Sequence, residues 1–288
     1  MDYCWVLSLF TFVVVVVVSS VNAIGIVDNT SFYDNYHLTW GLDHALLTNQ
    51  DKEIQLSMDT SSGSGFESNA LYGSGFFHFR MKIPEKNSSG VISTFYLSSA
   101  PPSSDHDEID FEFLGNNGPP YTLHTNLYTN GKGGREQQFR LWFDPTKQFH
   151  SYELLWNQYQ IVFLVDNVPI RVFKNNTEKG VSYPSKPMHI MASVWGPSWT
   201  GHIDWSQAPF QAHYRGFQVD GCVLNDYDMP KCYSSKYWWN NNKLWKLNPQ
   251  QGRSYQNVRQ NYLTYDYCSD PTRYPKPPPE CQFNREIR

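Results

Sequence analysis

Residues 106–113 of the chain read His-Asp-Glu-Ile-Asp-Phe-Glu-Phe, and acidic and apolar side chains alternate along them. A period of two is typical of a β-strand with one buried face. We therefore predict a strand whose apolar side chains enter a core and whose opposite face carries Glu108, Asp110 and Glu112. Carboxylates on one face repel each other. An acidic solvated strand or a loose calcium site is the structural alternative, but this crowding favours a chemical role.

A row of carboxylates suits the cleavage or transfer of a glycosidic bond with retained stereochemistry. That reaction uses one carboxylate as nucleophile and another as acid and then base, with carboxyl groups about 5–5.5 Å apart. The Cα atoms of Glu108 and Glu112 would lie about 13 Å apart on an ideal strand, so their side chains would have to lean together. Asp110 could hydrogen-bond to one glutamate and separate the two pKa values. The spacing alone does not assign a role to either glutamate.

The longer stretch from His106 to Asn116 reads His-Asp-Glu-Ile-Asp-Phe-Glu-Phe-Leu-Gly-Asn. It resembles the signature of the plant xyloglucan endotransglucosylase/hydrolases, which belong to glycoside hydrolase family 16. The resemblance runs from about residue 30 to the C-terminus. It implies that Glu108 is the nucleophile, Glu112 the acid/base and Asp110 a helper. We expect neither a cofactor nor a metal ion.

The composition argues against several other classes of function. With 288 residues and 40 % apolar content, the chain can bury the core of one large domain with or without an extension. A net charge of −4 and a pI of about 6.1 give no reason to expect nucleic acid or an anionic membrane as partner. Aromatic residues reach 16 %, which suits sugar binding because pyranose rings pack on aromatic planes. We expect a monomer.

The N-terminus has the pattern of a secretion signal. An apolar run extends from Trp5 to Val18 and small residues follow up to Ala23, although the segment carries Asp2 and lacks Lys or Arg. A membrane anchor is the alternative, but a spanning helix needs about 20 apolar residues. We predict that residues 1–23 are a signal peptide, that the protein is secreted to the cell wall and apoplast, and that it has no membrane contact after cleavage. N-glycosylation sequons stand at Asn29, Asn87 and Asn175.

Four cysteines remain after signal cleavage removes Cys4. All of them lie after residue 221: Cys222, Cys232, Cys268 and Cys281. In a secreted chain they predict two disulfides with three possible connectivities. Proximity in the sequence favours Cys222–Cys232 and Cys268–Cys281, and the resemblance implies the same pairing.

Residues 24–216 are predicted to form an all-β domain. Short alternating runs recur there between Gly, Asn, Asp and Pro, for example at residues 76–83 and 91–97. The runs at 160–165 and 168–173 flank Asp166-Asn167, a hairpin signal. Many short antiparallel strands indicate a sandwich or jelly roll. The resemblance implies the concanavalin-like β-jelly-roll of this family, with a substrate cleft across its concave face.

Residues 217–288 are expected to form a disulfide-stapled C-terminal extension. Tyr255, Val258, Tyr262 and Tyr265 recur at helical spacing, so we predict one short amphipathic helix over residues 253–265. The Pro-rich segment that follows between the last two cysteines is expected to be a cap or a linker.

Further polar side chains are assigned to the sugar cleft by the resemblance. They lie after the acidic strand, after a Gly-rich turn, in an aromatic loop and in the loop between the last two cysteines. Together with Glu112 they are His124, Thr125, Asn126, Gly134, Arg135, Glu136, Ser198, Trp199, Gly201 and Arg273. Each residue alone is explained as well by packing or by a surface ion pair. The matched set favours contact with xyloglucan.

The chain departs from the family pattern in three places. The sequon that usually follows the acidic strand is missing at residues 116–119. Gly134 stands where Asp or Asn is common. The loop from Trp195 to Trp205 is several residues shorter than in relatives, at the place where acceptor sugars are expected to bind. Acceptor binding is therefore the property in which we expect this chain to differ.

We interpret the sequence as that of a retaining transglucosylase of the cell wall. It would cut the β-1,4-glucan backbone of a xyloglucan donor and join the new end to a xyloglucan acceptor, in wall construction and remodelling. The short loop of residues 129–136 favours transfer, because strongly hydrolytic relatives carry a longer one. A xyloglucan endohydrolase and a mixed-linkage β-glucanase are the enzymatic alternatives. A non-catalytic polysaccharide-binding protein is the alternative of another class, although it would have no use for the acidic row.

Overall fold

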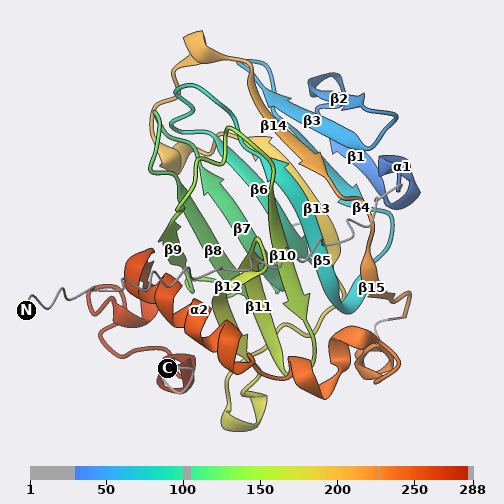
Figure 1. The fold of residues 1–288 in the computed structure, drawn as a ribbon, viewed down its shortest axis with the longest axis vertical. Coiled ribbons are helices and arrows are strands. Elements are labelled where there is room, and N and C mark those ends of the chain that lie inside the picture. Colours follow the sequence, from blue (N-terminus) through green and yellow to red (C-terminus); the bar gives the residue numbers. More distant parts are fainter. Residues whose placement is uncertain (1–29, 100–104, 227, 285–288) are drawn as a thin grey trace, which may run out of the picture.

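The computed structural model describes residues 30–99, 105–226 and 228–284, and these residues form two antiparallel β-sheets packed face to face (Figure 1). One sheet, here called the carboxylate sheet, has the order β1 (Tyr36–Trp40), β4 (Ser64–Ser68), β13 (His189–Trp195), β6 (Ile92–Ser98), β7 (Glu108–Leu114), β8 (Thr122–Tyr128), β9 (Gln137–Arg140) and β16 (Leu263–Asp266). The predicted all-β sandwich is therefore confirmed.

The other sheet, here called the helix-backed sheet, carries the longest strand of the fold. Its order is β12 (Val168–Lys174), β11 (Gln160–Val165), β10 (His150–Trp156), β5 (Tyr72–Lys82), β14 (Phe210–Arg215), β3 (Glu53–Met58) and β2 (Ala45–Thr48), and β15 (Asp220–Val223) also pairs with β5. The β11–β12 hairpin turns at Asp166-Asn167, where both residues have positive φ, as the sequence predicts.

Aromatic rings from the two sheets meet in the core. Phe111 of β7 packs edge-on against Phe163 of β11 with ring centroids 5.1 Å apart. Phe113 packs against Tyr152 of β10 at 4.6 Å. Because these rings are buried, the alternating residues of β7 must present their carboxylates on the other face of the sheet.

The helices are short and most belong to the C-terminal part. The α-helices are α1 (Phe32–Asn35), α2 (Pro249–Asn261) and α3 (Glu280–Asn284). The 3₁₀ turns are η1 (Leu42–His44), η2 (Thr177–Lys179), η3 (Ser198–Thr200), η4 (Trp205–Gln207), η5 (Met229–Tyr233), η6 (Trp238–Asn240), η7 (Asn242–Leu244) and η8 (Tyr267–Ser269). None of the helices in the described ranges is long and apolar enough to cross a membrane.

The predicted helix exists, but its predicted bounds are wrong. It begins at Pro249 because Asn248 and Gln251 cap each other's backbone N–H groups. It ends at Asn261, and Tyr265 lies instead on β16, opposite Gln138 of β9. The extension thus adds a strand to the carboxylate sheet.

Both predicted disulfides are present. Cys222–Cys232 and Cys268–Cys281 each have Cα atoms 5.4 Å apart. The extension, orange to red in Figure 1, also pairs β15 with β5 and packs α2 on β12, so it contacts both sheets. The predicted signal peptide and the sequon at Asn29 lie outside the described residues.

Candidate active site

The acidic residues of β7 line a cavity of about 300 Å³ on the carboxylate sheet. Glu108, Asp110 and Glu112 all line it, as their alternation predicts. The neighbouring strand β6 places Ser98, Tyr96 and Thr94 opposite them in register. The cavity wall is completed by Trp40, Ser193 and Trp195 from β1 and β13.

Asp110 and Glu108 share one buried hydrogen bond. Burial raises the pKa of Asp110 well above its ordinary value, and the charges of Glu108 and Glu112 raise it further. Burial also raises the pKa of Glu108, but hydrogen bonds from Ser98 and Asp110 oppose that rise. Asp110 is therefore the member of the pair that holds a proton more readily, with Glu108 as the acceptor of their hydrogen bond.

Glu112 has a different environment from the other two carboxyls. It lies opposite His124 of β8, and His124 Nδ1 is 3.1 Å from Glu112 Oε2. The direction of the contact does not make it a hydrogen bond, and both ring nitrogens of His124 are buried without a hydrogen-bond partner in the described structure. Both ring nitrogens are therefore hydrogen-bonding groups that the described protein atoms leave unused.

Tyr128 closes the Glu108 end of the acidic row. It lies opposite Glu108 in the β7–β8 register, and the ring of His106 stacks on it with centroids 5.1 Å apart. Burial, helped by the charges of Asp110 and Glu108, raises the pKa of Tyr128 to about 12. Its hydroxyl is therefore a neutral hydrogen-bonding group near the carboxylates at physiological pH.

Trp40 forms an aromatic wall of the cavity and is held by close packing. A Cβ on Gly65 of the adjacent strand would lie 2.5 Å from Trp40 Nε1, so only glycine allows the indole to lie against this backbone. Trp40 and Trp195 are each about 40 % exposed, which leaves ring surface free for a sugar.

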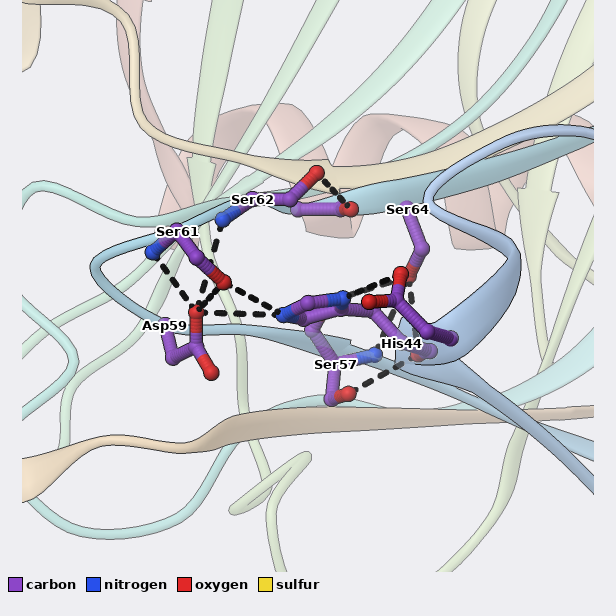
Figure 2. A network of polar contacts seen from close by, with 8 residues as sticks. His44, Ser57, Asp59, Ser61, Ser62 and Ser64 are labelled. Atoms are coloured by element: carbon purple, nitrogen blue, oxygen red, sulfur yellow. Dashed lines mark hydrogen bonds and ion pairs between the residues drawn. The ribbon is translucent and has the colours of Figure 1, made fainter.

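A polar network fixes the chain just after Trp40 (Figure 2). His44 Nδ1 lies 2.9 Å from Asp43 and His44 Nε2 lies 3.1 Å from Asp59. Hydrogen bonds to these two carboxylates raise the pKa of His44. Ser57 and Ser64 both donate to the carbonyl of His44, so this turn is tied to β3 and β4.

The three polar residues predicted on β8 do not all lie on the same face of the sheet. His124 and Asn126 lie opposite Glu112 and Asp110 in register, and Asn126 Oδ1 accepts from the backbone N–H of Arg135. Thr125 is fully buried; its hydroxyl donates to Gln137 O and accepts from the buried Arg171. The structure thus gives the Thr125 side chain a packing position and does not bring it to the cavity.

Gly134, Arg135, Glu136 and Arg273 form a second cluster, joined to the C-terminal extension. Arg273 pairs with both carboxylate oxygens of Glu136, at 2.6 and 3.0 Å. Arg135 Nε donates to Glu280 Oε1 at 2.7 Å, so its guanidinium faces the extension.

Gly134 is the position at which the family resemblance predicts Asp or Asn. It has a φ of +81°, and a Cβ there would lie 2.3 Å from the Tyr274 hydroxyl, which donates to Gly134 O. An Asp or Asn at this position would displace Tyr274, so the two residues fit each other.

The aromatic loop after β13 carries the third predicted group, Ser198, Trp199 and Gly201. Trp199 is 61 % exposed and is not among the side chains that line the cavity. Gly201 has a φ of +94° and open space at its Cβ position. Thr200 anchors the loop by donating to Gly90 O and Pro197 O. Trp199 therefore projects from a fixed loop toward solvent.

Sequence reasoning missed five lining residues, Trp40, Tyr96, Thr94, Ser193 and Trp195. Tyr96 and Thr94 carried a signal, since they alternate with the buried Phe95 and Leu97. The remaining three reach the site through the strand order β1-β4-β13-β6-β7, which no local pattern reveals. No group of three side chains suited to a metal ion occurs in the ranges that the structure describes.

The chain is similar to known proteins over nearly its full length. Residues 32–215 match the family model Glycosyl hydrolases family 16, and residues 233–281 match Xyloglucan endo-transglycosylase (XET) C-terminus. "Xyloglucan endotransglucosylase/hydrolase protein 2" of Arabidopsis thaliana is 50 % identical, with 98 % of each chain covered. "Xyloglucan endotransglucosylase protein 34" of Populus tremula x Populus tremuloides is 47 % identical, with 90 % of each covered. Among solved structures, a β-glucanase of Bacillus licheniformis has a TM-score of 0.55 and 26 % identity over 65 % of this chain and 92 % of its own.

Proposed function

Since this chain belongs to the xyloglucan endotransglucosylase/hydrolases of glycosyl hydrolase family 16, we propose that it cuts xyloglucan and rejoins the new end to a second xyloglucan chain. The observation that carries the proposal is the row of Glu108, Asp110 and Glu112 inside one cavity, and the strongly raised pKa of Asp110 supports it. A retaining transfer needs an ionised nucleophile and a separate acid in this arrangement.

The first half of the proposed reaction forms a covalent glycosyl-enzyme. Glu108 attacks the anomeric carbon of the donor backbone, and the bond to the leaving glycosidic oxygen breaks as Glu112 gives that oxygen a proton. Asp110 donates to Glu108 throughout and keeps its own proton. Because Asp110 is neutral, it adds no negative charge beside the nucleophile.

The second half returns the enzyme to its starting state. Glu112, now ionised, removes a proton from the acceptor hydroxyl, whose oxygen attacks the anomeric carbon and displaces Glu108. A sugar hydroxyl gives transfer and water gives hydrolysis. His124, beside Glu112 and without a hydrogen-bond partner of its own, is placed to bind a hydroxyl of the sugar there.

The remaining predicted contacts belong to this proposal as residues around the cavity. We place Asn126, Gly134, Arg135, Glu136 and Arg273 along the side of β8 and β9. Ser198, Trp199 and Gly201 belong to the loop after β13. The tight turn at Asn130-Gly131 keeps residues 129–136 short, which supports transfer over hydrolysis.

The biological setting is proposed from the sequence. Residues 1–23 would be removed as a signal peptide, residues 24–216 would form the catalytic domain and residues 217–288 the extension. The mature protein would act as a monomer in the cell wall and apoplast, with glycans on Asn29, Asn87 or Asn175. Asn87 and Asn175 are partly exposed, which supports their use as acceptors.

The test is to follow xyloglucan size and reducing ends with and without a fluorescent xyloglucan oligosaccharide. Transfer should move label into polymer without a matching rise in reducing ends. Glu108→Gln is the matched inactive control. If reducing ends rise equally with and without the acceptor oligosaccharide, the enzyme is a hydrolase and not a transferase. If it acts on mixed-linkage β-glucan and not on xyloglucan, the proposed substrate is wrong.

A further inference from the structure

A basic groove lies on the far side of the molecule from the carboxylates. It has a volume of about 840 Å³ and lies between η7 and the first turns of α2. This volume is within the range of about 300–1,000 Å³ that is usual for ligand pockets. Its charged lining consists of Lys174, Lys243, Lys246 and Arg253, and no carboxylate is among the described residues that line it.

The alternation of side chains along the strands of the helix-backed sheet shows on which face of the sheet the groove lies. The depression that adjoins the groove is lined by Phe76, Val162 and Leu164, which alternate with the core residues Phe77 and Phe163. The groove therefore lies on the outer face of this sheet, and the whole sandwich separates it from the cavity on the carboxylate sheet.

No acid of the described residues forms an ion pair with any of the four cations. Lys174 donates to Gln160 Oε1 and Trp245 O, both neutral oxygens. Its partial burial and the nearby charge of Lys246 lower its pKa to about 8. Lys243, Lys246 and Arg253 are exposed. In a chain of net charge −4, this local concentration of positive charge is a feature that a bound anion would stabilise.

Aromatic rings flank the charged residues. Trp245 is 42 % exposed and stacks on Tyr159, with ring centroids 4.0 Å apart. Trp238 is 48 % exposed and lines the adjoining depression together with Lys246. Flat ring faces bind the apolar faces of pyranoses, whereas the ammonium and guanidinium groups bind carboxylates.

We propose that this groove binds an acidic polysaccharide, a chain of pyranoses that carry carboxylates, as a docking site separate from the transfer reaction. The combination of sugar-stacking rings and unneutralised cations favours a polyuronide over a neutral glucan. Bound there, the enzyme would be held against an acidic polymer while its cavity remains open to xyloglucan.

The experiment is affinity electrophoresis of the full-length protein in gels that contain polygalacturonate, fully methyl-esterified polygalacturonate or single-stranded DNA. The parent should be retarded by polygalacturonate, and the ester should have no effect because it lacks charge. Retardation should disappear near 0.5 M NaCl, since exposed charges are screened there. The Lys243→Gln/Lys246→Gln/Arg253→Gln variant should bind polygalacturonate about tenfold more weakly, at about twofold for each exposed contact.

A matched variant, Arg80→Gln/Arg140→Gln/Lys147→Gln, removes three exposed cations elsewhere and should bind as the parent does. Both variants should keep xyloglucan transfer within twofold, which also shows that they fold. Absence of retardation, or equal weakening by the two variants, would overturn the docking site. Stronger retardation by DNA than by polygalacturonate would overturn the choice of partner.

Discussion

The carboxylates of β7 and the acidic residues that join the extension to the sandwich are held in opposite ways. Glu136 and Glu280 each face an arginine across this boundary, at 2.6 and 2.7 Å, and Asp266 pairs with Arg259 within the extension at 2.7 Å. Glu108 and Asp110 instead share a proton with each other, and the group beside Glu112 is a histidine. The two regions lie on the same sheet, because β16 of the extension pairs with β9.

The difference shows that the carboxylates of β7 lower the stability of the fold, whereas the ion-paired cluster raises it. A buried carboxyl without a cation is costly, and its pKa rises until it holds a proton. Such a group can serve as a proton-sharing partner in catalysis, whereas one locked to arginine cannot. We therefore expect substitutions in β7 to cost activity and substitutions in the ion-paired cluster to cost stability.

Glu108→Gln should have the largest effect. Loss of the nucleophile should lower transfer by at least about a thousandfold, or about 4 kcal/mol of transition-state stabilisation. The free energy of unfolding should not fall, because a neutral amide replaces a partly buried charge. Initial rates with labelled acceptor, together with urea denaturation, measure both quantities. Activity within tenfold of the parent would remove Glu108 from this role.

Glu280→Ala should show the opposite pattern. The carboxylate side chain is 4 % exposed and its removal leaves the Arg135 guanidinium, 13 % exposed, without its acid. Breaking such a buried pair costs about 3–5 kcal/mol in unfolding free energy. Asp226→Asn, which breaks an exposed pair with Lys231, is the control and should leave the melting temperature unchanged. Equal melting temperatures for Glu280→Ala and the parent would contradict the claim that the ion-paired cluster stabilises the fold.

Asp110→Asn should slow catalysis and stabilise the fold. The raised pKa of Asp110 means that, above the unfolded value near 3.9, the unfolded state binds fewer protons than the native state. Stability is then lost as pH rises from that value through the raised native pKa, and asparagine avoids this loss because it cannot ionise. Below about pH 3 the variant and parent should converge. Denaturation at pH 3, 5 and 7 tests this, and a variant less stable at pH 7 would show that Asp110 is ionised there.

Trp199→Ala should have the smallest effect and act on the acceptor alone. The indole is mostly exposed, so unfolding should not change. Loss of a stacking platform worth about 1 kcal/mol should raise the acceptor KM and lower the transfer-to-hydrolysis ratio about fivefold, because water needs no platform. Trp238→Ala, an exposed indole in the extension, is the control. An unchanged ratio across an acceptor titration would remove Trp199 from the acceptor site.

Local patterns in the sequence predicted the parts of the site that lie on one strand. The alternation of β7 placed its carboxylates and core rings correctly, and short separations gave both disulfides. The same alternation along β8 would have directed Thr125 into the core, where the structure has it.

Contacts between distant segments could not be predicted in this way. Tyr265 continues a helical spacing in the sequence, yet pairing with β9 draws it into a strand. Trp40 reaches the cavity through strand order, and the Tyr274–Gly134 contact joins segments far apart in the sequence. In each case the burial and hydrogen bonds of the tertiary fold decide the outcome over local propensity.

The central claim, that Glu108 is the nucleophile and Asp110 holds the proton beside it, can be tested by trapping the intermediate. A xyloglucan oligosaccharide with fluorine at C2 of the reacting sugar and a good leaving group should form a slowly hydrolysed glycosyl-enzyme. Peptide mass mapping should then locate the sugar on Glu108, in the parent and at a slower rate in Asp110→Asn. An adduct on Glu112 or Asp110, or turnover with no adduct on the acidic strand, would contradict the account.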